Sequence, residues 1–237
     1  MKPLHIGIVG CSAEGAALCY RTLCTEGSTL LGPHAHPEVT MHTPSFADYV
    51  ACLDRGDMAG VGALMLASGH KLAAVGADFL ICPDNTIHQA MPHVEPHSPL
   101  PWLHIAEVVA AEAASRGHRR IGITGTQWLT ESEVYPEKLA ARGLDWLRPE
   151  PAQRARIGRI IMEELVYGVQ SPDSVADIVA VIADLARRGC DAVVLGCTEL
   201  PLVIGESNSP LPFLDSTRLL ARAALRRAVD GHGAGAG

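Results

Sequence analysis

A decisive stretch of this chain reads Ala192-Val193-Val194-Leu195-Gly196-Cys197-Thr198-Glu199-Leu200-Pro201. Its first half is a short apolar run, which is typical of a strand buried on both faces of a parallel sheet. Small and polar residues follow at once, so Cys197 is presented at the edge of that sheet. Because ligands of α/β sheets bind at the carboxyl ends of the strands, the stretch indicates both a fold class and a place for chemistry.

Other apolar runs repeat this signal. Strands are expected at 6–9, 79–82, 121–124 and 192–196, with two weaker ones at 39–42 and 211–214. Helical spacing is found at 45–53, 57–76, 104–116, 154–166 and 172–188. Strands that alternate with helices predict an α/β protein with doubly wound parallel sheets.

The two halves of the chain carry a similar pattern of strands and strand-end residues. Superposing its halves sets Asp84 against Cys197 and Gly10 near Gly125. We therefore expect two pseudo-symmetric lobes, residues 1–105 and 106–214, with the active site in the cleft between them. The first lobe is expected to be completed by a C-terminal helix at 215–229, and the Gly/Ala-rich tail 230–237 to be disordered.

Composition narrows the class of protein. The formal net charge of −7 argues against a general nucleic-acid binder, which normally carries a basic face. No run approaches the ~20 apolar residues that cross a membrane, and no targeting segment is visible. The seven cysteines are odd in number and form no CxxC pair, so we expect free thiols in a reducing cytoplasm.

Cys197 is the first candidate for chemistry. Backbone N–H groups near a strand end can lower the pKa of a thiol, and Thr198 and Glu199 can orient the thiol or share its proton. The alternative is a small buried cysteine with no reaction to perform.

Asp84-Asn85-Thr86 forms the matching tip in the first half. It supplies a carboxylate, an amide and a hydroxyl, which together suit a small polar ligand. The alternative is that Asp84 or Asn85 only caps the next helix. A third candidate is Ser12, in a glycine-containing turn that is not G-x-G-x-x-G. The turn can bring backbone N–H groups to a small anion, or it is a plain tight turn.

The order of several motifs resembles the aspartate/glutamate racemase family, and its aspartate-type amino-acid racemases most. The motifs, which span most of the chain from Ile6 to about Leu225, are Asn85-Thr86-x-His88, Gly125-Thr126 with Thr130, Ser132 and Tyr135, Gly196-Cys197-Thr198-Glu199, and Asp215-Ser216-Thr217. The resemblance implies two lobes, a homodimer and racemisation without a cofactor. It also implies two cysteines that flank the α-carbon, one removing the α-proton and the other returning one.

The resemblance further implies that Asn85, Thr86 and Thr126 hold the substrate's α-carboxylate. His88, which belongs to the same motif as Asn85 and Thr86, can tune Asp84 or a ligand carboxylate. Alternatively, His88 only starts the next helix. The chain's other histidines match no standard metal-ligand spacing, so no metal site is expected.

Two departures from the family pattern stand out. Asp84 occupies the position of the first family cysteine, and Cys82 lies two residues further back along the strand. Aspartate-type members bind a distal carboxylate with an Arg and a Lys, and both are missing here. His42, Thr43 and Ser45 are therefore candidates for contacting the distal group of the substrate. An acidic substrate side chain is therefore not expected.

Three hypotheses remain open. The first is a racemase or epimerase of an amino acid or a related α-substituted carboxylic acid, with Cys197 and Asp84 as the acid/base pair. The second is a one-cysteine lyase or isomerase of the decarboxylase or cis–trans isomerase type. The third is an altered protein that only binds small carboxylates.

Overall fold

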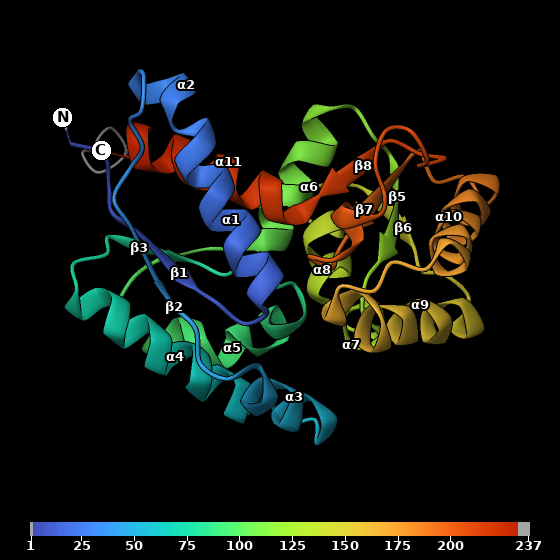
Figure 1. Ribbon diagram of the computed structural model, residues 1–237, viewed down its shortest axis with the longest axis horizontal. Coiled ribbons are helices and arrows are strands. Elements are labelled where there is room, and N and C mark those ends of the chain that lie inside the picture. The colour runs from blue at the N-terminus through green and yellow to red at the C-terminus, as the bar shows by residue number, and fades with distance from the viewer. Residues whose placement is uncertain (1, 232–237) are drawn as a thin grey trace. The chain divides into compact units, whose positions relative to one another are not determined.

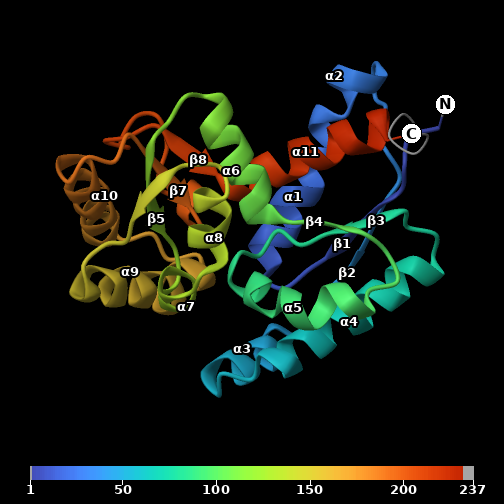
Figure 2. The same cartoon turned by 180° about the vertical axis from the view of Figure 1, so that it is seen from behind.

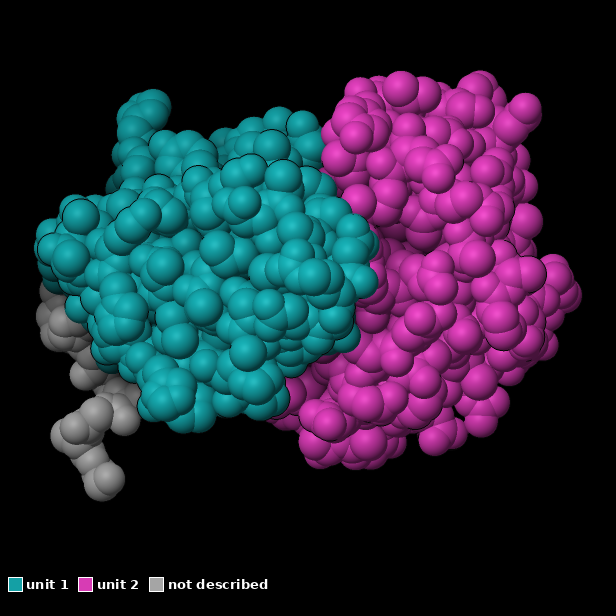
Figure 3. All heavy atoms as spheres, turned by 90° about the horizontal axis from the view of Figure 1, so that it is seen from below, with its two compact units in different colours: residues 1–105, 217–237 teal, residues 106–216 magenta. Residues whose placement is uncertain are grey.

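The computed structural model describes residues 2–231. The chain forms two compact units, residues 1–105 with 217–237 and residues 106–216 (Figure 3). Each unit contains a four-stranded parallel sheet with helices packed against it (Figures 1 and 2). The predicted α/β class with two doubly wound lobes is confirmed.

Unit 1 has the strand order β2-β1-β3-β4. Helices α1 and α11 cover one face of this sheet, and α4 and α5 cover the other (Figure 1). Its elements are β1 (Ile6–Val9), α1 (Ala13–Glu26), α2 (Ser28–Leu31), β2 (Val39–His42), α3 (Phe46–Asp54), α4 (Met58–Ala74), β3 (Phe79–Ile81), η1 (Thr86–Ala90), α5 (Met91–Val94), η2 (Glu95–His97), β4 (Trp102–Leu103) and α11 (Ser216–Asp230).

Unit 2 has the equivalent strand order β6-β5-β7-β8. Apolar side chains of α9, α10 and β7 form one continuous core cluster. Its elements are α6 (Ile105–Ser115), β5 (Arg120–Thr124), α7 (Gln127–Glu131), α8 (Val134–Ala140), β6 (Asp145–Leu147), α9 (Pro151–Glu163), η3 (Leu165–Tyr167), α10 (Pro172–Arg187), β7 (Ala192–Leu195), η4 (Leu200–Leu202) and β8 (Phe213–Asp215).

Local sequence explains where these helices begin and end. Asp57 caps α4 by accepting the Gly60 N–H at 2.8 Å. Gly76 and Gly189 follow α4 and α10 with φ of 89° and 91°, a left-handed region that favours glycine. Each glycine turns the chain directly into the next central strand, β3 or β7.

The C-terminal helix also belongs to unit 1. Arg222 of α11 pairs with Glu26 of α1 at 2.7 Å, and the Arg227 guanidinium stacks over the Phe79 ring of β3. This helix runs to Asp230, so the expected disordered tail was wrong at that residue, and residues 232–237 lie outside the described part of the chain.

Candidate active site

The candidate residues follow the two central strands of each sheet. In unit 1, β1 lies between β2 and β3, so the chain crosses from β1 to β2 in one direction and then returns past β1 to reach β3. In unit 2, β5 lies between β6 and β7 in the same way. Such a reversal opens a crevice at the carboxyl ends of the two central strands. Ser12 and Asp84 follow β1 and β3, and Thr126 and Cys197 follow β5 and β7.

Cys197 lies next to a buried carboxylate. Its thiol donates to Glu199 Oε2 at 2.8 Å, and the Thr198 hydroxyl donates to the same oxygen at 2.7 Å. Cys197 is 8% exposed and Glu199 is 3% exposed. Because the hydrogen of the thiol points to a carboxylate oxygen, the pair can pass a proton and leave a thiolate, which is the reactive form of cysteine.

Close backbone packing fixes the position of Cys197. A side chain at Gly196 would meet Thr124 O at 2.5 Å and Leu129 Cδ2 at 2.6 Å. Cys197 itself belongs to the apolar cluster formed by α9, α10 and β7. Only glycine therefore allows the chain to leave β7 at this point and set the thiol beside Glu199.

Thr126 occupies the neighbouring strand tip in unit 2. Residues Thr124 and Leu195 are the last paired residues of β5 and β7, and two further residues along each chain reach Thr126 and Cys197. Thr126 Oγ1 caps α7 by accepting the Leu129 N–H at 3.2 Å. Thr130 donates to Thr126 O at 3.1 Å, so this hydroxyl supports the turn.

Asp84 forms the turn that follows β3. Its Oδ1 accepts the N–H groups of Thr86 at 3.0 Å and Ile87 at 3.4 Å, at the start of η1. This is the capping geometry that sequence reasoning offered as the alternative for Asp84. The two N–H groups hold the carboxylate in a fixed orientation. Asn85 is the N-terminal cap residue of η1 and is buried.

His88 forms hydrogen bonds with the backbone of the same turn and of Ile105. Its Nδ1 lies 2.7 Å from Asp84 O, and its Nε2 lies 3.4 Å from the Ile105 N–H. Since an N–H can only donate and a carbonyl can only accept, Nδ1 carries the proton and the imidazole is neutral. The His104 ring packs edge-on against it, with centroids 4.6 Å apart. Through its Nδ1 contact His88 acts on the main chain of Asp84.

Cys82 is fully buried behind Asp84. Its thiol lies 3.7 Å from Asp84 O, and burial, reinforced by the charge of Asp84, raises the pKa of this thiol well above its usual value. Cys82 therefore stays protonated and is poorly suited to act as a base.

The two serine candidates differ in exposure. Ser12 is buried and caps α1 by accepting the Gly15 N–H at 3.4 Å, as the plain-turn alternative expected. Ser45 is exposed at the N-cap position of α3 and makes no cap hydrogen bond. One turn later on α3, the Tyr49 side chain is fully buried.

Sequence reasoning did not include Tyr49 or Cys11 in the candidate site. The Tyr49 hydroxyl has no hydrogen-bond partner within residues 2–231. Burial raises the pKa of this phenol, and the nearby Cys82, Cys11 and Asp84 add to the increase. Cys11 follows β1 and is 2% exposed. The signal for Cys11 was its place immediately after a buried strand, the same feature that singled out Cys197.

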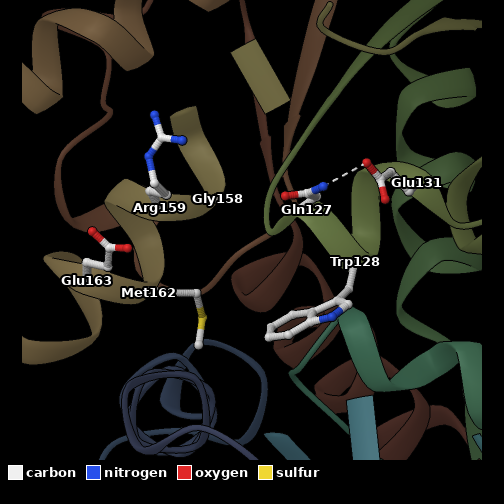
Figure 4. Close-up of a pocket in the computed structure, with 7 residues that line it drawn as sticks. All are labelled: Gln127, Trp128, Glu131, Gly158, Arg159, Met162 and Glu163. Atoms are coloured by element: carbon white, nitrogen blue, oxygen red, sulfur yellow. Dashed lines mark hydrogen bonds between the residues drawn. The ribbon is translucent and has the colours of Figure 1, made fainter. Parts of the chain in front are cut away.

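Unit 2 also contains a hollow of about 370 Å³ between α7 and α9, within the size range of small-molecule sites. Trp128 and Met162 provide apolar walls, and Gln127 donates to Glu131 at 3.0 Å (Figure 4). The remaining lining residues come from α9: Gly158, Arg159 and Glu163. Gly158 packs against Gln127, which starts α7 directly after Thr126.

Within residues 2–231, no three His, Cys, Asp or Glu side chains are grouped to hold a metal ion. No helix in that range is long and apolar enough to cross a membrane.

The profile of the Asp/Glu/Hydantoin racemase family matches residues 7–224. The chain belongs to this family. It is 24% identical over 158 residues to the broad specificity amino-acid racemase RacX of Bacillus subtilis, covering 65% of this chain and 66% of RacX. It is 34% identical over 131 residues to a glutamate racemase of Thermus thermophilus, covering 53% and 46%. The matches thus span between about half and two thirds of these curated relatives.

Solved structures of the family extend the similarity to nearly the whole chain. A Yersinia pestis protein described as a candidate Asp/Glu racemase has a TM-score of 0.87 and 28% identity, covering 97% of this chain and all of that one. An aspartate racemase homologue from Pyrococcus horikoshii has a TM-score of 0.80 and 25% identity, covering 96% and 99%. The resemblance inferred from the ordered motifs is confirmed at the level of the family.

Proposed function

We propose that this protein is a cofactor-independent racemase or epimerase of an amino acid or a related α-substituted carboxylic acid. The observation that carries the proposal is the Cys197 thiol, which donates to Glu199 Oε2 at 2.8 Å at a strand switch point. Membership of the Asp/Glu/Hydantoin racemase family supports proton transfer at an α-carbon as the reaction.

The reaction removes a proton from one face of the α-carbon and adds a proton to the opposite face. Glu199 accepts the thiol proton of Cys197, and the resulting thiolate removes the α-proton. A proton supplied by the Asp84 tip then adds to the opposite face and gives the other enantiomer. This is general acid–base catalysis with two positioned groups.

The substrate's α-carboxylate needs hydrogen-bond donors that also stabilise the carbanion-like state. We assign this role to Ser12, Asn85, Thr86, Thr126 and the backbone N–H of Thr198, whose hydroxyl is engaged with Glu199. His88 holds the Asp84 turn in place. The names of the relatives, a broad specificity amino-acid racemase and a glutamate racemase, support an amino acid as substrate. The exposed Ser45 is assigned to the distal group of the substrate.

We also propose that the protein is cytoplasmic and works as a homodimer. All seven cysteines are free, which supports a reducing compartment. The homodimer is carried over from the family resemblance.

A panel of L- and D-amino acids, followed by chiral chromatography, tests the proposed reaction. We expect the wild-type protein to convert at least one amino acid to its enantiomer, and Cys197→Ser to lose roughly 10²-fold or more in kcat. Cys190→Ser is the matched control, because Cys190 is another buried thiol of unit 2. Equal activity of Cys197→Ser and wild type would remove the proposed role of Cys197.

A one-thiol lyase or isomerase is the second candidate. The observation that favours it is the pair of N–H groups held by Asp84 Oδ1, which gives Asp84 a structural use. Asp84→Asn separates the candidates, since the amide keeps an oxygen for the cap but cannot take up a proton. A two-base racemase loses activity on this change, whereas an enzyme that uses only Cys197 keeps it.

A further inference from the structure

Strand register places a second thiol at the Asp84 tip. In the pairing of β1 with β3, Ile8 lies opposite Ile81, and three further residues along each chain reach Cys11 and Asp84. In unit 2, the same continuation beyond β5 and β7 reaches Thr126 and Cys197. Neighbouring strands lie roughly 4.8 Å apart, so we expect the two residues at each pair of tips to be neighbours.

The two units thus carry related chemistry on different strands. Unit 2 has its thiol on the second tip, at Cys197, beside the Glu199 carboxylate. Unit 1 has its carboxylate on the second tip, at Asp84, and a thiol on the first tip, at Cys11. A thiol and a carboxylate therefore occur together in both units, although position 84 itself is not cysteine.

A buried hydroxyl independently marks the unit 1 tips as a place for a ligand. Tyr49 is 0% exposed, and its hydroxyl lies near Ser68 but makes no hydrogen bond of good geometry within residues 2–231. It lies close enough to Cys11, Cys82 and Asp84 for each of them to raise its pKa. The adjacent Ser68 hydroxyl is engaged with Leu64 O at 3.2 Å and with His42 Nδ1 at 3.0 Å. A buried donor without a partner is costly unless a ligand accepts its hydrogen bond.

We infer that Cys11 supplies the second thiol of the reaction and that Asp84 acts through it as its proton partner. This inference rests on the proposed racemase function. Asp84 takes the thiol proton of Cys11, and the Cys11 thiolate removes the α-proton of one enantiomer to become a thiol again. The Cys197 thiol then donates its proton to the opposite face of the α-carbon and becomes a thiolate.

Two successive conversions in opposite directions return both pairs of residues to their starting protonation states. One conversion leaves an additional proton at the Cys11–Asp84 pair and a thiolate at Cys197. The reverse conversion, or proton exchange with solvent, restores the starting state. Cys82 takes no part, because it is fully buried with its thiol directed at Asp84 O.

Hydrogen exchange with each enantiomer in D2O tests the inference. We expect wild type to exchange the α-hydrogen of both enantiomers of its substrate. Cys11→Ser should exchange only the enantiomer whose α-proton is taken by Cys197, and Cys197→Ser only the other one. Asp84→Asn should slow the same enantiomer as Cys11→Ser, each by roughly 10²-fold or more. Cys82→Ala should exchange both.

The outcomes separate the inference from the function on which it rests. Exchange of both enantiomers at wild-type rates by Cys11→Ser, with one enantiomer lost in Asp84→Asn, would overturn the role of Cys11 and leave the racemase intact. No exchange of any amino acid by wild type would overturn the proposed function itself. The enantiomer that still exchanges shows that a variant is folded, and Cys11→Ala serves as a second variant with the same expected result.

Discussion

The Cys197 thiol lies 2.8 Å from Glu199 Oε2, and that oxygen also accepts the Thr198 hydroxyl at 2.7 Å. The three residues are consecutive, so one short turn after β7 makes the pair. Glu199→Gln keeps the shape of this turn but removes the group that can take up the thiol proton. We expect kcat for racemisation to fall roughly 10²-fold.

The control for this change is Glu206→Gln, which alters an exposed carboxylate of the same segment. It should leave kcat unchanged, and far-UV circular dichroism should match wild type for both variants. Full activity in Glu199→Gln would show that the thiol does not need this carboxylate.

Gly196 and Gly205 form a matched pair for testing how the Cys197 turn is built. A Cβ at Gly196 would lie 2.5 Å from Thr124 O, whereas nothing lies within 4 Å of one at Gly205. We expect Gly196→Ala to lower the free energy of unfolding by about 1–3 kcal/mol and to reduce activity, because the thiol is displaced. Gly205→Ala should change neither. Urea denaturation with an activity assay measures both, and similar effects at the two positions would contradict the packing argument.

The two buried tyrosines should respond differently to loss of their hydroxyls. Tyr135 is hydrogen-bonded to Ser216, so Tyr135→Phe should cost about 1 kcal/mol of unfolding free energy. The Tyr49 hydroxyl lies near Ser68 but makes no hydrogen bond of good geometry within residues 2–231, so Tyr49→Phe should change that free energy by less than about 0.5 kcal/mol or stabilise the protein. Equal losses in the two variants would show that the Tyr49 hydroxyl is paired within the protein.

His42 should make unfolding stability depend on pH. Lys71 Nζ can only donate to His42 Nε2 at 2.9 Å, so Nδ1–H donates to Ser68 at 3.0 Å and the ring is neutral. Partial burial and then the charge of Lys71 lower the pKa of His42 below 6.5. The unfolded chain therefore binds the proton more readily, and this contribution to stability is lost as the pH falls below 6.5.

Urea midpoints between pH 7.5 and 5 measure this dependence. The slope of the urea midpoint against pH should be smaller in His42→Gln than in wild type, because glutamine does not titrate. An unchanged slope would mean that other groups cause it.

The sequence predicted the central strands well because they are buried on both faces. β1 matches the expected residues, and β3, β5 and β7 differ by one residue at one end. The edge strand β2, which is only partly buried, also matches the weaker expectation at 39–42. The edge strands β4 and β6 were missed. They have two and three residues, and Trp102–Leu103 and Asp145–Leu147 carry no apolar run that periodicity could detect. The strand expected at 211–214 lies at Phe213–Asp215, since Pro212 precedes it.

Part of the candidate site could be predicted from the sequence for the same reason. Cys197 and Asp84 stand shortly after short apolar runs, so their places at strand ends follow from sequence. The part played by Asp84 Oδ1 in capping η1 could be named only as an alternative, because a carboxylate after a strand suits both uses. Tyr49 could not be found, since its burial depends on how α3 packs within unit 1.

The central claim is that a thiol exchanges the α-proton of an amino acid. Proton NMR in D2O, with the wild-type enzyme and single enantiomers of a panel of amino acids, tests it most directly. We predict loss of the α-proton signal for at least one amino acid, starting from either enantiomer, and no such loss with the Cys11→Ser, Cys197→Ser double variant. Persistence of every α-proton signal with the wild-type protein would contradict it.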